Sequence, residues 1–396
     1  MATPLRKDPR ETVGRGDWQS WPTYDGAASG LQNYWYPVEW SVEVTHRPRA
    51  VRICGEDLVL QRGASGKAYA LHDRCIHRGV KLSLGKQEFP DTITCPYHAW
   101  TYRLEDGELV AVITDGPDSP ICGKVRVRSY PTEERLGLAW VFIGDREPHA
   151  IDSQLPEELV GAKPFAVGGR VDDRAGNWRF YAENGFDEGH AKYLHRTSLW
   201  RTFKVMPAWN LVRIERQGRW IFRIEDERHW DAEFPGLGRW TNDRWWKIKP
   251  KQQQGKMLGN TGGSKRNDPY IQGLGLPGFA SLSVPGVLRI AYPQFIHYEF
   301  YVPVDENNTK YVGVMVQFKT GLAKLGFYLK YLLGIRWLFH GQFSGQDHWM
   351  VEATDAPPER LYRPDVSLIE WRKLVEEGNP FEAQAEACQK EERESL

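Results

Sequence analysis

Residues 75–102 read CIHRGVKLSLGKQEFPDTITCPYHAWTY, and this stretch carries two short motifs of cysteine and histidine. The first motif pairs Cys75 with His77, the second pairs Cys95 with His98, and 17 residues separate the two. Two thiolates and two imidazoles on two short arms provide a full ligand set for a metal centre. The stretch therefore predicts a metal site formed by two loops.

Two kinds of metal centre accept this set. A structural zinc ion binds it in one tetrahedral shell, whereas a Rieske [2Fe–2S] cluster uses the cysteines for one iron and the histidines for the other. Each arm holds one residue of each type, so each arm can reach both irons. Residues 92–94 and 99–102, on either side of the second motif, are strand-like. We expect two loops at the tips of antiparallel strands that close over a cluster, with a zinc ribbon as the alternative.

The composition describes a chain of two to three domain lengths with room for a large core. It has 396 residues, and 52 basic and 52 acidic residues give a formal net charge of zero. This balance gives no indication of a nucleic-acid partner or of an anionic membrane surface. The 17 Trp, 17 Tyr and 16 Phe residues belong mostly to core and interfaces, and a minority could line an apolar ligand cavity.

Three of the five cysteines, Cys54, Cys122 and Cys388, lie outside the two motifs in unrelated contexts. Three cysteines in unrelated contexts do not form a disulfide framework, and such free thiols are consistent with a reducing cytoplasm. The first residues contain no apolar run of the kind that a secretory signal needs. We therefore expect a cytoplasmic protein.

The most apolar segment, residues 322–339, is interrupted by Lys324, Lys330 and Arg336. A helix that spans a bilayer needs about 20 mostly uncharged residues. We therefore expect a core or interface helix here, with membrane association as the less favoured interpretation, and we expect no membrane partner.

Three regions with different patterns divide the chain. Residues 1–33 are polar and predict a loose N-terminal arm with one short helix near residues 27–33. Residues 34–155 contain short β-branched or alternating runs between glycine turns, which predicts an antiparallel β domain. Residues 156–396 mix strand and helix patterns, so the fold class is α+β. In this last region we expect strands at 210–224, 288–303 and 310–318 and helices at 183–195, 321–352 and 367–394.

A second constellation begins in residues 183–195, ENGFDEGHAKYLH. His190 and His195, together with the distant Asp347, provide the two imidazoles and one carboxylate of a non-haem Fe(II) site, which leaves adjacent positions open for O₂ and substrate chemistry. The two histidines are five residues apart, which an ideal α-helix separates by roughly 140°. Both can face one metal only if the helix bends or widens between them. Otherwise one histidine is packed and the other lies on the surface.

The order and spacing of the two constellations resemble those of the Rieske non-haem iron oxygenases, the terminal oxygenase α subunits of ring-hydroxylating systems. The resemblance covers residues 35–374. It implies that the four residues of the two cysteine–histidine motifs hold a [2Fe–2S] Rieske cluster and that His190, His195 and Asp347 hold a mononuclear non-haem Fe(II). It also implies that Asp187 carries electron transfer between the two metals.

The resemblance further implies an antiparallel β Rieske domain followed by a helix-grip-like catalytic domain, in which helices cover an antiparallel sheet. The implied enzyme is an oxidoreductase, a ring-hydroxylating dioxygenase of aromatic hydrocarbon catabolism that adds O₂ to an aromatic or heteroaromatic substrate. The chain is most similar to homotrimeric members with one type of subunit, and carbazole-like angular dioxygenation is favoured. In that type the second iron histidine follows the first one residue sooner than here.

The source of electrons is a separate protein. No nicotinamide- or flavin-binding glycine motif precedes a helix in the expected place. We therefore expect a ferredoxin, a ferredoxin reductase or both as partners, with NAD(P)H acting only through the reductase. Arg78, Lys81 and Lys86 flank the cluster motifs, where they could dock an acidic ferredoxin or form a solvated loop surface.

Residues around the predicted iron ligands are candidates for a substrate pocket, and each has ordinary core packing as its alternative. The carbonyl of Gly185 has no side chain to shield it, so it could accept a hydrogen bond from a substrate N–H or be an ordinary helical carbonyl. The candidates are Gly185, Phe186, Leu194, Leu199, Leu288, Tyr292, Phe295, His297 and Phe343.

Two other functions are open from the sequence. The same pair of metal centres serves Rieske monooxygenases and demethylases. A Rieske or zinc protein with only an electron-transfer or structural role would carry no iron at His190, His195 and Asp347.

Overall fold

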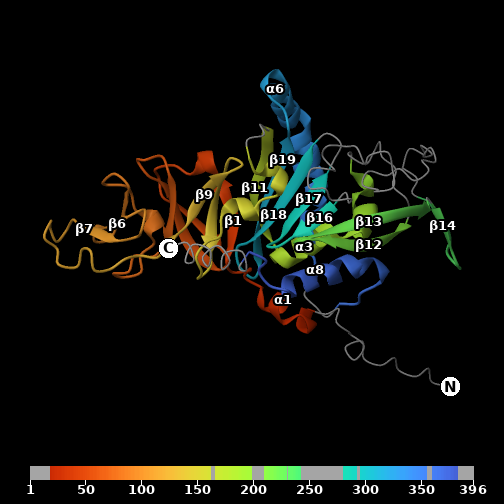
Figure 1. Cartoon of the computed structure of the whole chain (residues 1–396), viewed down its shortest axis with the longest axis horizontal. Helices are drawn as coiled ribbons and strands as arrows, with labels where there is room; N and C mark the ends of the chain where they lie inside the picture. Colours follow the sequence, from red (N-terminus) through yellow and green to blue (C-terminus); the bar gives the residue numbers. More distant parts are fainter. Residues whose placement is uncertain are drawn as a thin grey trace, which may run out of the picture.

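The computed structural model describes residues 18–161, 166–198, 209–229, 231–241, 280–291, 295–354 and 359–381. Figure 1 shows small antiparallel sheets at one end of the molecule and a larger sheet with helices at the other. The predicted α+β fold, with an antiparallel β domain before a helix-covered sheet, is confirmed.

The first half of the chain forms three antiparallel sheets with tight turns. One has the order β1-β10-β9, the second β2-β3-β4-β8, and the third β5-β6-β7, which carries the second cysteine–histidine motif between β5 and β6. The strands are β1 (Tyr34–Trp40), β2 (Arg49–Ile53), β3 (Glu56–Arg62), β4 (Ala68–His72), β5 (Thr92–Thr94), β6 (Trp100–Arg103), β7 (Leu109–Val112), β8 (Ser129–Tyr130), β9 (Thr132–Arg135) and β10 (Leu138–Ile143). Short helical turns are η3 (Ser41–Glu43), η4 (Leu82–Leu84), α2 (Ile151–Gln154) and η5 (Glu157–Leu159).

The second half is built on a seven-stranded antiparallel sheet with the order β11-β19-β18-β17-β16-β13-β12. All eight residues of β18 are buried, because helices or other elements cover both of its faces. The strands are β11 (Ala166–Ala175), β12 (Trp209–Gln217), β13 (Trp220–His229), β16 (Ala280–Ser283), β17 (Val287–Ala291), β18 (Ile296–Pro303) and β19 (Asn308–Gln317). A separate hairpin is formed by β14 (Asp231–Phe234) and β15 (Gly238–Thr241).

Helices position the predicted iron ligands against this sheet. Helix α3 contacts β16, β17, β18 and β19, and α8 contacts β12 and β13 (Figure 1). The predicted helix over residues 321–352 is confirmed, although its middle is π-helical. The helical elements are α3 (Trp178–Phe186), α4 (Glu188–Tyr193), η6 (Leu194–Thr197), α6 (Gly321–Lys330), η8 (Tyr331–Ile335), η9 (Trp337–Phe343), α7 (Ser344–Glu352), η10 (Arg363–Asp365) and α8 (Val366–Glu376).

Two expectations about the second half need correction. Residues 288–303 form two strands, β17 and β18, rather than one. Helix α8 ends at Glu376 and does not run through residues 377–381, and the part of the predicted helix beyond residue 381 lies outside the described residues. No helix in the described ranges is long and apolar enough to cross a bilayer.

The N-terminal segment differs most from its prediction. The structure places η2 (Trp18–Ser20) and α1 (Pro22–Gly26) before the expected helix position, and both pack into the core of the second half. Trp18 is 4% exposed and Tyr24 is fully buried. The prediction of a loose arm up to residue 33 is therefore wrong for residues 18–33, because its aromatic side chains bury more apolar surface than its polar composition suggests.

A buried polar network holds this segment in place. The Tyr24 hydroxyl donates to Glu183 Oε1 at 2.8 Å, and Arg372 Nε donates to the same oxygen at 2.7 Å. Glu183 lies on α3, four residues before Asp187, and Arg372 lies on α8. The N-terminal segment thus braces the helix from which the predicted iron site begins.

Candidate metal centres

The two cysteine–histidine loops have the same backbone geometry. In each, the cysteine carbonyl accepts a hydrogen bond from the N–H four residues later, from Gly79 to Cys75 at 2.8 Å and from Ala99 to Cys95 at 3.1 Å. Both donors have positive φ, +76° at Gly79 and +54° at Ala99. A left-handed residue turns each loop back on itself, so the two loops present their ligands as a matched pair.

The donor atoms are sorted by type between an inner and an outer layer. Cys75 and Cys95 are 2% and 3% exposed, whereas His77 is exposed. The rings of His77 and His98 lie 4.7 Å apart between centroids, and His77 stacks on Trp100 at 4.7 Å and 4°. Burial, together with the neighbouring Cys75 thiol, raises the pKa of Cys95. Paired thiols inside and paired imidazoles outside match the separate irons of a Rieske cluster.

A single zinc ion fits these loops less well. The donor atoms of a tetrahedral zinc lie within about 4 Å of one another. Among the residues that the structure describes, only His190, His195 and Asp347 bring three such atoms within 4.8 Å of one another. The donors of the cluster loops are therefore spread more widely than one zinc shell allows. Nδ1 of His98 is buried without a hydrogen-bond partner in the described chain, which leaves it available as a ligand.

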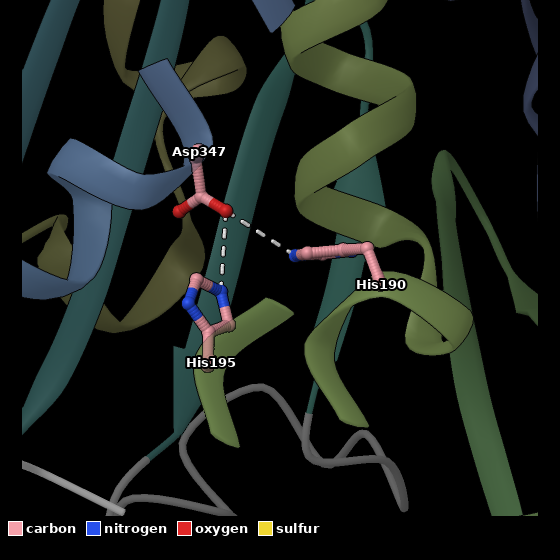
Figure 2. Close-up of side chains that lie close together, drawn as sticks. All are labelled: His190, His195 and Asp347. Atoms are coloured by element: carbon pink, nitrogen blue, oxygen red, sulfur yellow. Dashed lines mark ion pairs between the residues drawn. The ribbon is translucent and has the colours of Figure 1, made fainter. Parts of the chain in front are cut away.

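His190, His195 and Asp347 converge although they come from distant parts of the chain (Figure 2). Oδ1 of Asp347 lies 3.4 Å from Nε2 of His190 and 3.1 Å from Nε2 of His195. His195 is 1% exposed, and the side chains of the other two are 16% exposed. Asp347 Oδ1 makes no hydrogen bond of good geometry within the described residues. Three lone-pair donors around one point are the ligand set of a divalent metal with open positions.

The local sequence explains how the two histidines reach one point. Asp187 leaves the helical conformation, with φ −75° and ψ 128°, and its carboxylate caps α4 by accepting from the N–H groups of Gly189 at 2.7 Å and His190 at 2.9 Å. After Tyr193 the chain tightens into the 3₁₀ turn η6, which carries His195. The helix is thus irregular between the two histidines, as predicted, but it changes to a tighter 3₁₀ turn and does not widen into a π-helical turn.

The remaining ring nitrogen of each histidine faces an acceptor. Nδ1 of His195 lies 3.0 Å from Oε1 of Gln346, and Nδ1 of His190 faces Oδ2 of Asp187 at 3.5 Å without a hydrogen bond of good geometry. An acceptor at Nδ1 fixes the tautomer that leaves Nε2 free to bind a metal. The site therefore includes the outer groups that orient histidine ligands as well as the ligands.

The electrostatics of the site favour a bound cation. Burial alone would lower the pKa of His190, but Asp187 and Asp347 outweigh it and raise the pKa to about 10. Burial would raise the pKa of Asp187, but the side chain and backbone of His190 lower it to about 2. Burial would likewise raise the pKa of Asp347, but the two histidines outweigh burial and lower it. Without a metal, the two ionised carboxylates thus hold a proton on His190, and a divalent cation would displace that proton and take over the neutralising charge.

The structure separates Asp347 from the other nearby carboxylates. Glu352 is on the same helix, but its carboxylate lies 3.0 Å from Nε2 of His348 and its side chain is 42% exposed. Asp355 lies outside the described residues. The helical register therefore brings Asp347, and not Glu352, to the two histidines.

Several pocket candidates form an aromatic path that leads away from the triad. Phe343 stacks on His195, with ring centroids 3.7 Å apart and planes at 19°. Phe343 contacts Phe339 at 6.1 Å, and Phe339 contacts Phe295 at 5.3 Å and His297 at 6.1 Å. The structure thus connects three of the predicted residues, and Phe339, which the sequence analysis missed, joins them.

Other candidates are packed in the core. A Cβ at Gly185 would lie 2.1 Å from the hydroxyl of Tyr301 and 2.8 Å from Leu288, so the glycine is needed for close packing. Phe186 is 1% exposed, and its carbonyl accepts from Arg223 at 2.6 Å. Leu194 is half-buried in η6. Leu199 and Tyr292 lie outside the described residues.

Two residues near the triad carried too weak a signal to be predicted. Gln346 precedes Asp347 directly, which is the only sequence feature that could have indicated it. His340 is 2% exposed, 5.6 Å from His297 between ring centroids, and both of its ring nitrogens lack hydrogen-bond partners in the described chain. Burial, and the neighbouring His297, hold the pKa of His340 well below its usual value.

Two family models match the chain in the order that the fold suggests. Residues 34–131 match the Rieske [2Fe–2S] domain, and residues 142–208 and 254–380 match the homotrimeric ring hydroxylase. These families bind a Rieske cluster and a mononuclear iron, and the residues present here fit both groups, as the sorted donors of the loops and the convergent triad indicate.

Individual relatives agree with the family models. The terminal oxygenase component of carbazole 1,9a-dioxygenase from Sphingomonas sp. is 32% identical over 91% of this chain and 94% of its own length. The vanillate O-demethylase oxygenase subunit of Pseudomonas sp. is 34% identical over 42% of this chain and 46% of its own length. Among solved structures, the reduced complex of oxygenase and ferredoxin in carbazole 1,9a-dioxygenase matches with a TM-score of 0.71 and 26% identity, over 91% of this chain and 93% of that one. The chain therefore belongs to the Rieske non-haem iron ring-hydroxylating oxygenases, as an oxygenase α subunit.

Proposed function

We propose that this protein is the terminal oxygenase of a multicomponent system that dioxygenates an aromatic or heteroaromatic compound, with carbazole-like angular dioxygenation as the favoured reaction. Cys75, His77, Cys95 and His98 hold the cluster in this proposal. The single observation that carries it is the convergence of His190, His195 and Asp347 in a chain that also presents two matched cysteine–histidine loops.

Electrons enter at the exposed histidine edge of the cluster loops. His77 and Arg78 are exposed there, and the guanidinium of Arg78 lies 5.7 Å over the ring of Tyr97. We assign this edge to a ferredoxin, because a solved relative is a complex of an oxygenase with its ferredoxin. A reductase using NAD(P)H supplies the ferredoxin. Lys81 and Lys86 contribute less, since they already lie 3.9 Å from Asp57 and 2.7 Å from Glu88.

The electron then reaches the iron of a neighbouring subunit in a homotrimer. Figure 1 places β6 and β7 at one end of the molecule, away from α3, the helix that leads into α4 and His190. Asp187 carries the link, with its carboxylate bonded to the backbone of His190 and facing the ring of the same residue. Each carboxylate oxygen has more than one lone pair, so Asp187 can also accept from His98 of a neighbouring copy.

The bound iron supplies O₂ activation at its open positions. The protein's own residues hold that chemistry in place. Asp187 and Gln346 orient the two histidines, and Asp347 supplies the anionic ligand. Phe343 covers one face of His195 and, with Phe339, Phe295 and His297, provides an apolar wall for an aromatic ring. This wall keeps water from the reacting atoms.

A Rieske monooxygenase or demethylase activity is the second candidate. Similarity to a vanillate O-demethylase subunit over 42% of this chain favours it. The same residues would serve, and the difference would lie in how the substrate is held. Labelled oxygen separates the two, because a dioxygenase places both atoms of ¹⁸O₂ in the product and a monooxygenase places one.

Within this proposal, residues 34–155 form the Rieske domain and residues 156–396 the catalytic domain, to which residues 18–33 are attached. The free thiols of Cys54 and Cys122 are consistent with work in the cytoplasm.

Metal analysis of the anaerobically reconstituted protein tests the proposal. We expect three irons per chain, two in the cluster and one at the triad. Asp347→Ala should retain the two cluster irons and the cluster's visible spectrum, and lose the third iron together with product formation. Two irons in the wild-type chain, or zinc in the loops, would contradict the proposal.

A further inference from the structure

The helix that leads to Asp347 is apolar on two opposite faces. Its inner face carries Phe327, Tyr331 and Phe339, which are 4%, 4% and 1% exposed. Its outer face carries large exposed side chains, four of which lie two positions from an inner residue and so point the other way. These are Leu322, Leu325, Leu329, Leu332, Leu333 and Trp337, which are 86%, 55%, 52%, 61%, 86% and 58% exposed.

The inner face fixes the orientation of the helix. The ring of Tyr331 lies on Gly168 of β11 so closely that a Cβ at Gly168 would be 2.8 Å from it. Phe327 stacks on Tyr331 with centroids 6.1 Å apart, and Phe339 packs on Phe295. Because the inner face is anchored in this way, the outer stripe is held outward. Figure 1 shows α6 projecting from the body of the molecule beyond β19.

An outward stripe of six large apolar side chains is unusual on a protein surface. A helix that is apolar all round is found in a core or in lipid. The sequence predicted a core or interface helix. The inner face of the helix is part of the core, and the outer face is exposed and suited to an interface.

The charges of the segment indicate what covers it. Between residues 319 and 346 the chain contains Lys319, Lys324, Lys330 and Arg336 and no acidic residue. Lys319, Lys330 and Arg336 are exposed, and no described side chain forms an ion pair with any of the four. Apolar side chains interleaved with cations are the pattern of a helix that lies in the interface of an anionic bilayer.

We propose that the outer face of residues 321–337 docks on an anionic lipid surface, with its leucines at the acyl boundary and its lysines among the headgroups. The helix lies along the membrane and does not cross it. A second copy of the chain is the competing occupant, but protein interfaces are depleted in lysine, whereas lysine alternates with leucine here.

The position of this face gives docking a consequence for the reaction, which rests on the proposed function. Residues 333 and 347 belong to one continuous helical run, which at 1.5 Å per residue separates them by about 20 Å. Apolar aromatic compounds dissolve in the acyl region of a bilayer. Docking would therefore hold the iron site within about 20 Å of a store of such compounds.

Vesicle co-sedimentation of the full-length, metal-reconstituted protein tests the docking. We expect binding to vesicles of equal parts phosphatidylcholine and phosphatidylglycerol, and much weaker binding to pure phosphatidylcholine vesicles or in high salt. The triple variant L325Q/L329Q/L333Q and the charge variant K324E/K330E should each bind at least about tenfold more weakly. L237Q changes a leucine that is 88% exposed in the turn between β14 and β15, so it is a control for the loss of an exposed leucine elsewhere and should bind as the wild type does.

Sedimentation velocity and iron content of the same samples separate the outcomes. Unchanged mass and iron in a triple variant that no longer binds vesicles support the proposal, whatever the substrate of the enzyme. A wild-type protein that does not bind the anionic vesicles overturns it. A triple variant whose assembly falls apart also overturns it and assigns the face to contact between subunits.

Discussion

The Nδ1 atom of His195 lies 3.0 Å from the side-chain oxygen of Gln346, a residue 151 positions away in the sequence. This contact links η6 to α7 and directs Nε2 of the same ring toward Asp347, 3.1 Å away. Orientation of a histidine by a second residue of this kind is typical of metal sites, so within the proposed iron site we assign Gln346 as a positioning residue.

Replacement of Gln346 tests this role. Gln346→Leu should weaken iron binding at the triad by about 10- to 100-fold, because the ring of His195 loses the acceptor that fixes its tautomer. Iron retained after dialysis against a chelator measures the effect. Gln346→Glu keeps an acceptor oxygen and should keep most of the iron. Equal iron in the leucine variant and the wild type would remove Gln346 from the site.

The carboxylate of Asp187 has two tasks that one substitution can separate. Asp187→Asn keeps a good N-cap for α4, since asparagine also accepts from backbone N–H groups, but it removes the negative charge beside His190. We expect product formation and single-turnover electron transfer to fall by about 10- to 100-fold, while iron content and the cluster spectrum stay unchanged. Turnover close to that of the wild type would show that Asp187 is only a cap.

Charge reversal at the exposed edge of the cluster loops tests the ferredoxin site. Arg78→Glu should slow reduction of the cluster by ferredoxin by about tenfold at low ionic strength, and high salt should shrink the difference because it screens exposed charges. Lys86→Glu is a comparison of equal charge change at a lysine that already has Glu88 as a partner. Stopped-flow reduction rates measure both. Rates for Arg78→Glu that match the wild type at low salt would place docking elsewhere.

The stability of the protein should depend on pH through His149. This side chain is 9% exposed, contacts Gln154 at 3.2 Å and stacks on Phe381. Burial lowers its pKa from 6.5 to about 4. The neutral ring is therefore the folded form, so its contribution to stability is full above pH 6.5 and is lost as the pH falls toward 4. The loss amounts to about 3 kcal/mol.

Unfolding curves of the wild type and His149→Gln at several pH values measure this contribution. The variant should lose less stability than the wild type between pH 6.5 and 4, because glutamine does not titrate. Parallel losses in the two proteins would assign the acid sensitivity to other groups.

The sequence by itself determined which residues are the candidate ligands of the cluster, and it singled out the two histidines that the structure brings together with Asp347. Cysteine and histidine within three positions of each other share one loop, so their spacing already fixes what they can bind together. The irregularity within residues 183–195 was also visible locally, since two ligands five positions apart cannot share one face of a regular helix.

Only the tertiary structure decided between the predicted Asp347 and its neighbour Glu352, placed Gln346 against His195, and showed that residues 18–26 brace α3. Each of these contacts joins segments more than 100 residues apart, as in the 151 and 159 positions that separate His195 from Gln346 and Tyr24 from Glu183. Such contacts depend on how helices pack on the seven-stranded sheet, which local patterns do not specify. The sequence also could not show that the outer leucines are exposed, because whether an apolar side chain is buried depends on which elements pack against it in the folded chain.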